Sequence, residues 1–375
     1  MKRIFLFSIV ILSIFFLIAI FTPFSGMQEK DDNVLYIYSW SGNSNKAIIK
    51  QFEKETGIKV VVDFYDSNDV LEAKLLTGKT NYDIVSPSVT PNYIRQIGMG
   101  IYLPLDKKKL KNYHQLDPKI MKLIAQFDVG NQFGVPYALG TTGFAYVENK
   151  VNKVLPEGLP NSLKAIFDKN YIEKLSKCGV VFLDQAQDIL EAAQAYSGYT
   201  HPSCMKDDQL NKSVSVVQNI REHIKTFTTN VDMIVTQLAT GEICLAHLWS
   251  NDAFLAQQIA KQNNTGVTVK YMIPKEWPAL WIDMIAIPKS APHPDNAHKF
   301  IDFILRPEIA AQIIQETYMD MPNLGARAIL PQEIKDNPAI FTPADVLDNL
   351  RLQENLSIRQ ERKMMREWTR VKMGW

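Results

Sequence analysis

The chain has 375 residues, of which 46% are hydrophobic and 22% are charged, and its formal net charge is +1. This composition excludes a disordered or collagen-like chain, and a charge so close to zero argues against nucleic acid as the main partner. Because single hydrophobic cores rarely grow beyond about 250–300 residues, a chain of this length is expected to form two lobes.

The N-terminus carries a targeting segment. Met1–Arg3 contains two basic residues, and an apolar run interrupted only by two serines follows from Ile4 to Phe21. This order is typical of a secretory signal, but the run approaches the ~18–20 residues that span a bilayer, and no small-x-small cleavage site follows it. Residues 1–27 are therefore interpreted as either a signal peptide or a membrane anchor. Both alternatives place the chain from about Gln28 onward outside the cytoplasm, because the basic start stays inside.

Strands and helices alternate along the exported chain. The first set is expected to contain strands at Val34–Tyr38, Ile58–Phe64 and Asp83–Val85, with helices at Asn45–Thr56 and Asn68–Leu76 between them. Apolar residues recur with helical spacing in the first helix, and a glycine follows it as a stop signal. This βαβαβ order is typical of a parallel sheet covered by helices.

A second α/β set follows the segment Phe133–Tyr137. Its strands are expected at Thr141–Val147, Gly179–Leu183, Ile243–Leu248 and Val267–Ile273, and its helices at Ser162–Leu175, Asp188–Tyr196, Leu210–His223, Val231–Leu238 and Asp252–Gln262. A strand at Trp281–Ile287 should return to the first lobe, followed by helices at Asp295–Leu305 and Pro307–Gln315 and a charged helical tail at Ala344–Lys372. The predicted lobes are 33–140 plus 274–325 and 141–273 plus 326–375, with a ligand cleft between them.

Three separate segments place a large aromatic ring beside a carboxylate or an amide. They are Tyr38–Ser41, Trp249–Asp252 and Trp281–Asp283. Ring faces and anionic oxygens suit an extended organic cation, because methylenes lie against rings and ammonium groups need acceptors or π-faces. Each segment lies where a predicted strand ends or begins, and ligands of open α/β sheets bind outside the carboxyl ends of strands. We therefore expect the three segments to converge on one cleft.

The candidate residues also have structural explanations. Trp40 directly follows a strand, which favours a ligand wall over a core position. Ser88 could equally be a turn residue, and Asp252 a carboxylate placed to favour a helix N-terminus. Asp283 lies among apolar residues of a strand, where a carboxylate is costly to bury without a cationic partner. That partner is either a ligand ammonium group or a Lys or Arg of the chain itself.

Catalytic motifs are missing from the sequence. There is no Gly-x-Ser-x-Gly elbow, no phosphate-cradling glycine loop and no His-Glu-x-x-His. His247 lies within an apolar strand and is interpreted as a core histidine. The chain is therefore predicted to be a binding protein and not an enzyme, with no cofactor and no metal site.

Export would place the three cysteines in an oxidising compartment. An odd number allows at most one bridge within the chain. Cys178 and Cys244 each adjoin a predicted core strand, whereas Cys204 lies in a polar loop. We therefore favour a Cys178–Cys244 bridge, with Cys204 free.

Short sequence blocks follow one another along almost the whole exported chain. They are Phe52–Val60, Asp66–Asn68, Leu103–Asp106, Pro136–Tyr137, Thr141–Gly143, Cys178–Val180, Phe182–Asp184, Ile273–Glu276, Pro343–Val346 and Trp368–Lys372. In this order they resemble the periplasmic polyamine-binding proteins of ABC transporters, closest to the putrescine-binding type. The resemblance implies a type II, two-lobed periplasmic-binding-protein fold. It also implies a periplasmic monomer that captures putrescine or spermidine and delivers it to ABC permease subunits.

The same resemblance assigns roles to individual residues. The cleft positions of the family fall on Trp40, Ser41, Ser88, Trp249, Asp252, Trp281 and Asp283, and a cleft glutamate falls on Asp188. In the family the aromatic rings sandwich the methylene chain of the ligand and the acids hold its terminal amines. The resemblance further implies a disulfide, which maps onto Cys178 and Cys244.

Four features depart from the family's pattern. Gly42-Asn43 stand where an acid–aromatic pair usually follows Trp-Ser, and Asp188 is one methylene shorter than glutamate. Met319 stands at the position of a family tyrosine, although Tyr318 adjoins it, and Trp281 replaces a smaller ring. One end of the cleft is therefore expected to hold its amine more weakly. The alternatives are a binding protein for another small amine or an amino acid, a homologue that has lost polyamine affinity, and a membrane-anchored sensor with the same fold.

Overall fold

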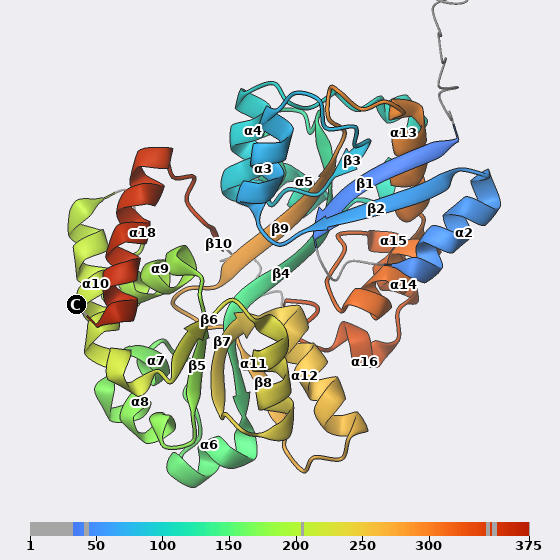
Figure 1. The fold of residues 1–375 in the computed structure, drawn as a ribbon. Helices are drawn as coiled ribbons and strands as arrows, with labels where there is room; N and C mark the ends of the chain where they lie inside the picture. Colours follow the sequence, from blue (N-terminus) through green and yellow to red (C-terminus); the bar gives the residue numbers. More distant parts are fainter. Residues whose placement is uncertain (1–32, 41–44, 204–205, 343–345, 347–350, 375) are drawn as a thin grey trace, which may run out of the picture. The chain divides into compact units, whose positions relative to one another are not determined.

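The central sheet of the protein is mixed, and its strand order is β2-β1-β3-β9-β4-β7-β5-β6, with β10 on β9 and β8 on β4 (Figure 1). The computed structural model describes residues 33–40, 45–203, 206–342, 346 and 351–374. The strands are β1 (Val34–Trp40), β2 (Lys59–Tyr65), β3 (Ile84–Val85), β4 (Gly134–Val147), β5 (Val180–Leu183), β6 (Thr226–Thr228), β7 (Leu245–Trp249), β8 (Val269–Met272), β9 (Ala279–Ala286) and β10 (Arg351–Leu352).

The two ends of the sheet are parallel and its middle is antiparallel. Strand β1 pairs in parallel with β2 and β3, as the βαβαβ pattern predicts, and β5 pairs in parallel with β6 and β7. Strand β9 is antiparallel to β3 and β4, and β4 is antiparallel to β7 and β8. In Figure 1 the long strands β4 and β9 run between the two groups of helices. This architecture is a two-lobed α/β fold.

Strand β4 differs from its prediction. The sequence suggested a strand from Thr141, but the strand is continuous from Gly134 and almost entirely buried. Pro136 would normally argue against such a strand, because it cannot donate a hydrogen bond to its neighbour. Here it lies where the register with β9 shifts between Pro136 and Ala138. Such an irregularity accommodates the missing donor.

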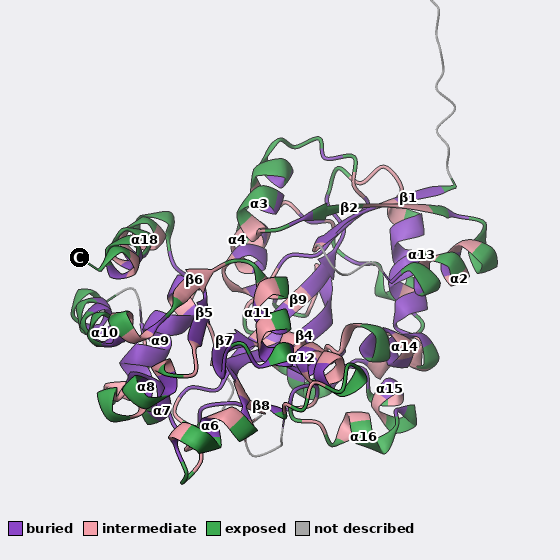
Figure 2. Ribbon diagram, turned by 60° about the horizontal axis from the view of Figure 1, so that its bottom comes forward, coloured by how far each residue is buried: buried purple, intermediate pink, exposed green. Residues whose placement is uncertain are grey.

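Helices cover both parallel parts of the sheet. Beside β1–β3 lie α2 (Lys46–Thr56), α3 (Asn68–Leu76), α4 (Ile94–Gly98), α5 (Pro118–Ile124), α13 (Pro294–Ile304), α14 (Pro307–Thr317), α15 (Leu324–Ile329) and α16 (Gln332–Lys335). Beside β5–β7 lie α6 (Glu148–Val154), α7 (Lys164–Phe167), α8 (Lys169–Ser176), α9 (Ala186–Tyr196), α10 (Asp207–Ile220), α11 (Val231–Thr240), α12 (Ser250–Gln262) and α18 (Ile358–Met373). Figure 2 shows the central strands buried and the outer sides of many helices exposed.

Two predicted helices need correction. The single helix expected at Ser162–Leu175 is two helices, because Asp168 adopts an extended conformation and its side chain caps α8 by accepting from the Asn170 amide. The tail expected to be helical over Ala344–Lys372 contains β10 and an extended segment, and α18 begins only at Ile358. Ser357 sets that start through a capping box with Gln360.

The predicted disulfide is present. Cys178 and Cys244 are bonded, with their Cα atoms 5.5 Å apart, and they join the end of α8 to the start of β7. Cys204 lies outside the described residues. Within the part of the chain that the structure describes, no helix is long and apolar enough to cross a membrane. The apolar run Ile4–Phe21 is not among those residues.

Candidate ligand-binding site

The candidate residues lie on both sides of the middle of β4. Ala138 pairs with Asp283 of β9, Gly140 with Trp281, and Thr142 with Trp249 of β7. Because β9 and β7 flank β4, Asp283, Trp281 and Trp249 all pair with one stretch of five residues, 138–142, on β4. The carboxyl ends of β3 and β7 approach this stretch from opposite directions, since the two strands are antiparallel in the common sheet.

Asp283 is held by a hydroxyl, and no cation of the described residues pairs with it. Ser88, three residues after the end of β3, forms an isolated bridge with Asp283, and its Oγ donates to Asp283 Oδ1 at 2.6 Å. Burial raises the pKa of Asp283 from 3.8 to about 7, and the Ser88 hydrogen bond only partly opposes this rise. Asp283 forms no ion pair with any described Lys, Arg or His, so the alternative of a structural salt bridge is wrong for this part of the chain. The carboxylate therefore has one hydroxyl partner and no cationic partner among the described residues.

Aromatic rings line the end of β1. The ring of Trp40 lies 4.8 Å from that of Tyr65, which in turn meets Tyr38 edge-on at 4.8 Å. Trp40 is partly buried, and its Nε1 has no hydrogen-bond partner among the described residues. Ser41 lies outside the described residues, as do Gly42 and Asn43. The first half of the site therefore presents an aromatic wall beside the Ser88–Asp283 pair.

Gly140 makes room for the ring of Trp281. A Cβ atom at Gly140 would lie 2.3 Å from Cζ2 of Trp281 and 2.8 Å from Oγ of Ser250. Both distances are far below van der Waals contact, so only glycine lets the indole lie directly against β4. The Thr141 amide donates to Ser250 Oγ at 3.2 Å, which fixes the start of α12 on the same stretch of β4.

Trp249 and Asp252 come from the junction of β7 and α12. Trp249 is the last residue of the strand, and Asp252 lies in the first helical turn, as the sequence predicts. Burial raises the pKa of Asp252 from 3.8 to about 7, although Asn251 hydrogen-bonds to it. A carboxylate that served only the helix terminus would have a lowered pKa. Asp252 therefore has a neutral hydrogen-bond partner, Asn251, but forms no ion pair with a described residue.

Asp188 lies in the first turn of α9, directly after β5. Its carboxylate accepts from Nε2 of Gln353 at 2.5 Å and also from Thr142. Burial nevertheless raises its pKa from 3.8 to about 6. Burial raises the pKa of the Tyr271 hydroxyl, and the charges of Asp188 and Asp252 raise it further. The second half of the site thus contributes two acids.

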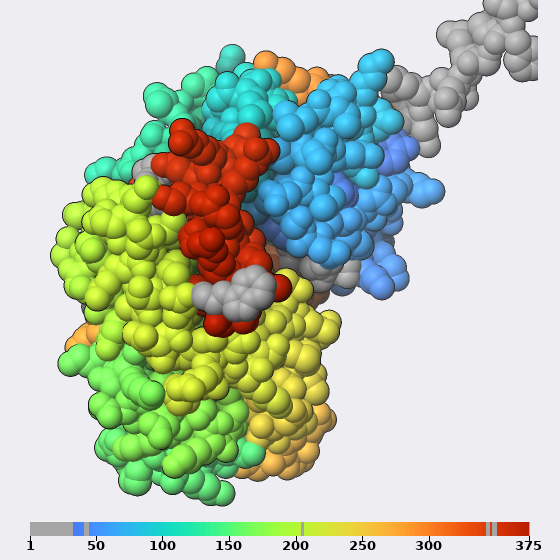
Figure 3. All heavy atoms as spheres, turned by 60° about the vertical axis from the view of Figure 1, so that its left-hand side comes forward, coloured from blue at the N-terminus to red at the C-terminus, as the bar shows by residue number. Residues whose placement is uncertain are grey.

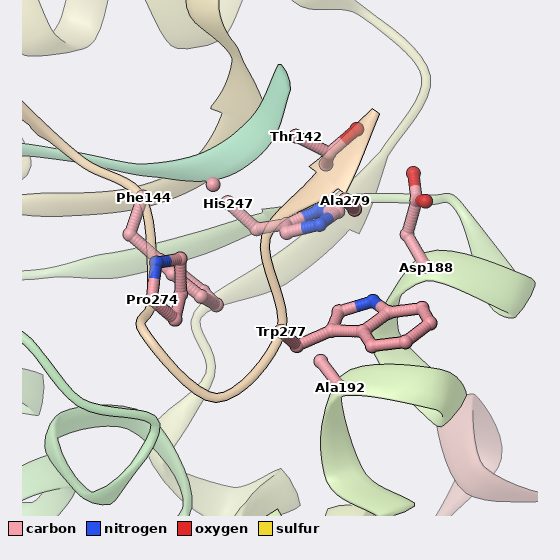
Figure 4. A pocket seen from close by; sticks show the side chains of 9 residues that line it. Thr142, Phe144, Asp188, Ala192, His247, Pro274, Trp277 and Ala279 are labelled. Atoms are coloured by element: carbon pink, nitrogen blue, oxygen red, sulfur yellow. The ribbon is translucent and has the colours of Figure 1, made fainter. Parts of the chain in front are cut away.

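A small cavity lies beside Asp188 (Figure 4). Its lining residues are Thr142, Gly143, Phe144, Asp188, Ala192, His247, Pro274, Trp277 and Ala279. Trp277 Nε1 and His247 Nδ1 have no partner within the described parts of the chain. His247 is buried, as predicted for a core histidine, and burial lowers its pKa to about 4, so that it is neutral.

Sequence reasoning missed several residues of this region. Gln353 donates to Asp188 from a segment far away in the chain, and the Tyr271 hydroxyl donates to the Thr141 carbonyl of β4. Trp277 lies in the connection between β8 and β9. Glu276 directly precedes Trp277, so a ring beside a carboxylate could have singled out that residue, whereas no acid adjoins Tyr271. Thr142 was visible only as part of a family-like block and not as a contact of Asp188.

The fold and this junction of rings and unpaired carboxylates define a two-lobed solute-binding protein. The chain belongs to the family of bacterial extracellular solute-binding proteins, which matches residues 47–342. The expected fold class and the expectation of a binding protein in place of an enzyme are therefore confirmed.

Two relatives and one solved structure illustrate the similarity. The chain is 37% identical over 350 residues to the putrescine-binding periplasmic protein PotF of Escherichia coli (strain K12), covering 93% of this chain and 94% of the relative. It is 38% identical over 352 residues to the putrescine-binding periplasmic protein SpuD of Pseudomonas aeruginosa (strain UCBPP-PA14), covering 93% and 95%. The structure of the spermidine/putrescine ABC transporter substrate-binding protein PotD from Streptococcus pneumoniae has a TM-score of 0.77 at 26% identity, covering 91% of this chain and 99% of that one.

Proposed function

We propose that this protein captures a polyamine, putrescine or spermidine, outside the cytoplasm and delivers it to the permease of an ABC transporter. The observation that carries this proposal is the set of three acids, Asp188, Asp252 and Asp283. They lie among aromatic rings and form no ion pair with a described residue of the protein. The similarity to putrescine-binding relatives supports the same ligand class.

Each group has a distinct task in this proposal. Asp283 holds one ammonium group, and Ser88 fixes the orientation of its carboxylate. Asp252 and Asp188 hold the other end of the ligand through charge-assisted hydrogen bonds. The rings of Trp40, Trp249 and Trp281, with Ser41 beside the first, enclose the methylene chain and add cation–π attraction.

Ligand capture then requires the two lobes to close. We assign residues 33–140 and 274–342 to one lobe and residues 141–273 and 351–374 to the other, so that β4 runs between them. The break predicted after residue 325 would divide α15, and Ala326, Leu330, Ala339 and Ile340 share a hydrophobic core with Leu35 and Phe52. Closure around the ligand removes water from the acids and strengthens their attraction for the ammonium groups. The protein acts as a periplasmic monomer, with residues 1–27 either removed or retained as an anchor.

Calorimetry with a panel of amines tests the ligand. Putrescine, spermidine, spermine, agmatine and arginine are titrated into the purified protein, and at least one of the first two should bind with a Kd of about 10 µM or tighter. Binding of agmatine or arginine alone would assign a different amine. If none of the five binds at millimolar concentration to protein with a cooperative melting transition, polyamine capture is wrong.

Mass spectrometry of the protein from its native envelope decides the fate of the N-terminus. A mass that corresponds to a chain beginning near Gln28 indicates a cleaved signal. A mass that retains residues 1–27, together with recovery in the membrane fraction, indicates an anchor and favours a tethered binding protein.

A further inference from the structure

Helix α18 concentrates the positive charge of the chain. Between Ile358 and Met373 the helix contains six basic and two acidic residues, whereas the whole chain has a net charge of only +1. The remainder of the chain is therefore net negative. A region of opposite sign to the rest of a protein steers association with an oppositely charged surface.

The inner face of α18 fixes the helix on the protein. Met364, Trp368 and Val371 are buried in the same hydrophobic core as residues of α9 and α10. The indole Nε1 of Trp368 also donates to Asp184 Oδ1 at 2.6 Å. The opposite face is therefore presented to solvent on a rigid support.

The exposed residues of α18 form one continuous stripe, which we call the α18 outer face. They are Ile358, Arg359, Arg362, Met365, Arg366, Thr369, Arg370 and Met373. Their spacing of three and four residues places them on one side of the helix. Figure 3 shows α18, in red, lying along the surface of the molecule.

The arginines of the α18 outer face are poorly neutralised by the protein. Arg359 and Arg362 form no ion pair with any residue in the described ranges, while Arg366 and Arg370 share the single carboxylate of Glu367. The other charges of the helix are paired away from this face, in the pairs Glu361–Arg95, Lys363–Asp207 and Lys372–Asp184. The stripe thus has an uncompensated positive charge.

Apolar side chains are interspersed among these arginines. Ile358, Met365 and Met373 are 51%, 47% and 58% exposed, and they are spaced along the whole length of the stripe. Guanidinium groups bind phosphate oxygens in a bidentate manner, and exposed apolar side chains enter the boundary between headgroups and acyl chains. An acidic protein would satisfy the arginines but would not require apolar residues at three separate positions.

We propose that the α18 outer face docks the protein onto a membrane surface rich in anionic phospholipids. Docking by this face does not use the candidate ligand-binding residues, since none of them belongs to α18. It requires neither a bound ligand nor an N-terminal anchor.

Vesicle flotation tests the proposal with a matched pair of variants. The protein is mixed with phosphatidylcholine vesicles that contain either no phosphatidylglycerol or roughly one-third of it. We expect flotation with the anionic vesicles at low salt, and loss of that binding at high salt. The double variant Arg359→Gln/Arg362→Gln should lower the partition constant roughly 30-fold. The control Lys50→Gln/Lys54→Gln removes the same amount of charge from the exposed side of α2 and should leave the partition constant unchanged.

A second measurement remains decisive if the N-terminus anchors every variant in the vesicles. An environment-sensitive dye attached at Thr369→Cys, in a Cys204→Ser background, should shift to shorter wavelength with anionic vesicles only. The Arg359→Gln/Arg362→Gln change should abolish this shift. An unshifted dye, an unaffected double variant, or an equal effect of the α2 control would each overturn the proposal. Identical melting temperatures of the variants exclude loss of folding as the cause.

Discussion

Asp283 and Asp188, which lie in different halves of the candidate site, are held in different ways. Asp283, from the half built on β1–β3, has one neutral hydroxyl as its side-chain partner. Asp188, from the half built on β5–β7, already accepts from Gln353 and Thr142. Both acids have raised pKa values, but the pKa of Asp283 rises to about 7 and that of Asp188 only to about 6.

This difference indicates which carboxylate contributes more to the affinity for the ligand. A buried carboxylate with two donors is partly satisfied by the protein, and an added ammonium group gains less there. A carboxylate with a single hydroxyl donor lacks a strong partner until a cation arrives. We therefore expect Asp283 to dominate affinity and Asp188 to adjust it.

The largest effect is expected from Asp283→Asn. The amide keeps an acceptor for Ser88 but loses the charge that binds the ammonium group, so affinity should fall by about 3 kcal/mol, or roughly 150-fold. The melting temperature of the unliganded protein should stay the same or rise, because a costly buried charge is removed. Calorimetry and thermal unfolding measure the two quantities.

A matched control is Glu173→Gln, which neutralises an exposed acid on α8. It should change neither affinity nor melting temperature. A strongly destabilised Asp283→Asn protein would mean that the carboxylate is needed for folding, and the comparison between the two acids would then fail.

A rise in pH should strengthen ligand binding but lower the stability of the unliganded protein. Asp252 and Asp283 have pKa values of about 7 in the unliganded protein, against an ordinary value of 3.8. The folded state binds these protons more tightly than the unfolded chain, so their contribution to stability is complete below pH 3.8 and is lost as the pH rises to 7. Binding of an amine, which stays protonated throughout, requires the ionised acids and should weaken roughly tenfold for each acid between pH 8 and pH 6.

Calorimetry and thermal unfolding at pH 6 and pH 8 check both signs. In the Asp283→Asn protein about half of the pH dependence of binding should disappear. Affinity that does not change between pH 6 and pH 8 would show that these acids do not hold the ligand.

Local patterns in the sequence predicted the elements of the fold well. The helix at Asn68–Leu76 has the expected bounds, and Cys178 and Cys244 are bonded as expected. Long-range packing was harder to foresee. The continuity of β4 through Pro136 depends on its register with β9, and the contact of Gln353 with Asp188 joins residues 165 positions apart.

The candidate site was predicted from a mixture of chemistry and resemblance. The sequence identified Asp283 as a carboxylate in need of a cation, and the structure excludes a described residue as that cation. It could not indicate that Gly140 must be small, because the reason is a tryptophan on a neighbouring strand.

A smaller effect is expected from Gly140→Ala. The added methyl group would overlap the ring of Trp281, so the ring must move away from β4. Affinity should fall about tenfold, since Trp281 and Asp283 lie on the same strand, β9. Gly98→Ala is the matched control, because nothing lies within 4 Å of a Cβ atom there. Equal affinities of the two variants would show that the position of Trp281 does not matter for the ligand.

The smallest effect is expected from Asp188→Asn. The amide oxygen still accepts from Gln353, so the unliganded structure should be kept, and only the charge facing the ligand is lost. Because this carboxylate is already shared by two donors, affinity should fall by about 1 kcal/mol, or roughly fivefold. The side-by-side measurement with Asp283→Asn decides the comparison. An effect of Asp188→Asn as large as that of Asp283→Asn would mean that the two ends of the ligand are held equally, and that Gln353 and Thr142 give up the carboxylate when the ligand binds.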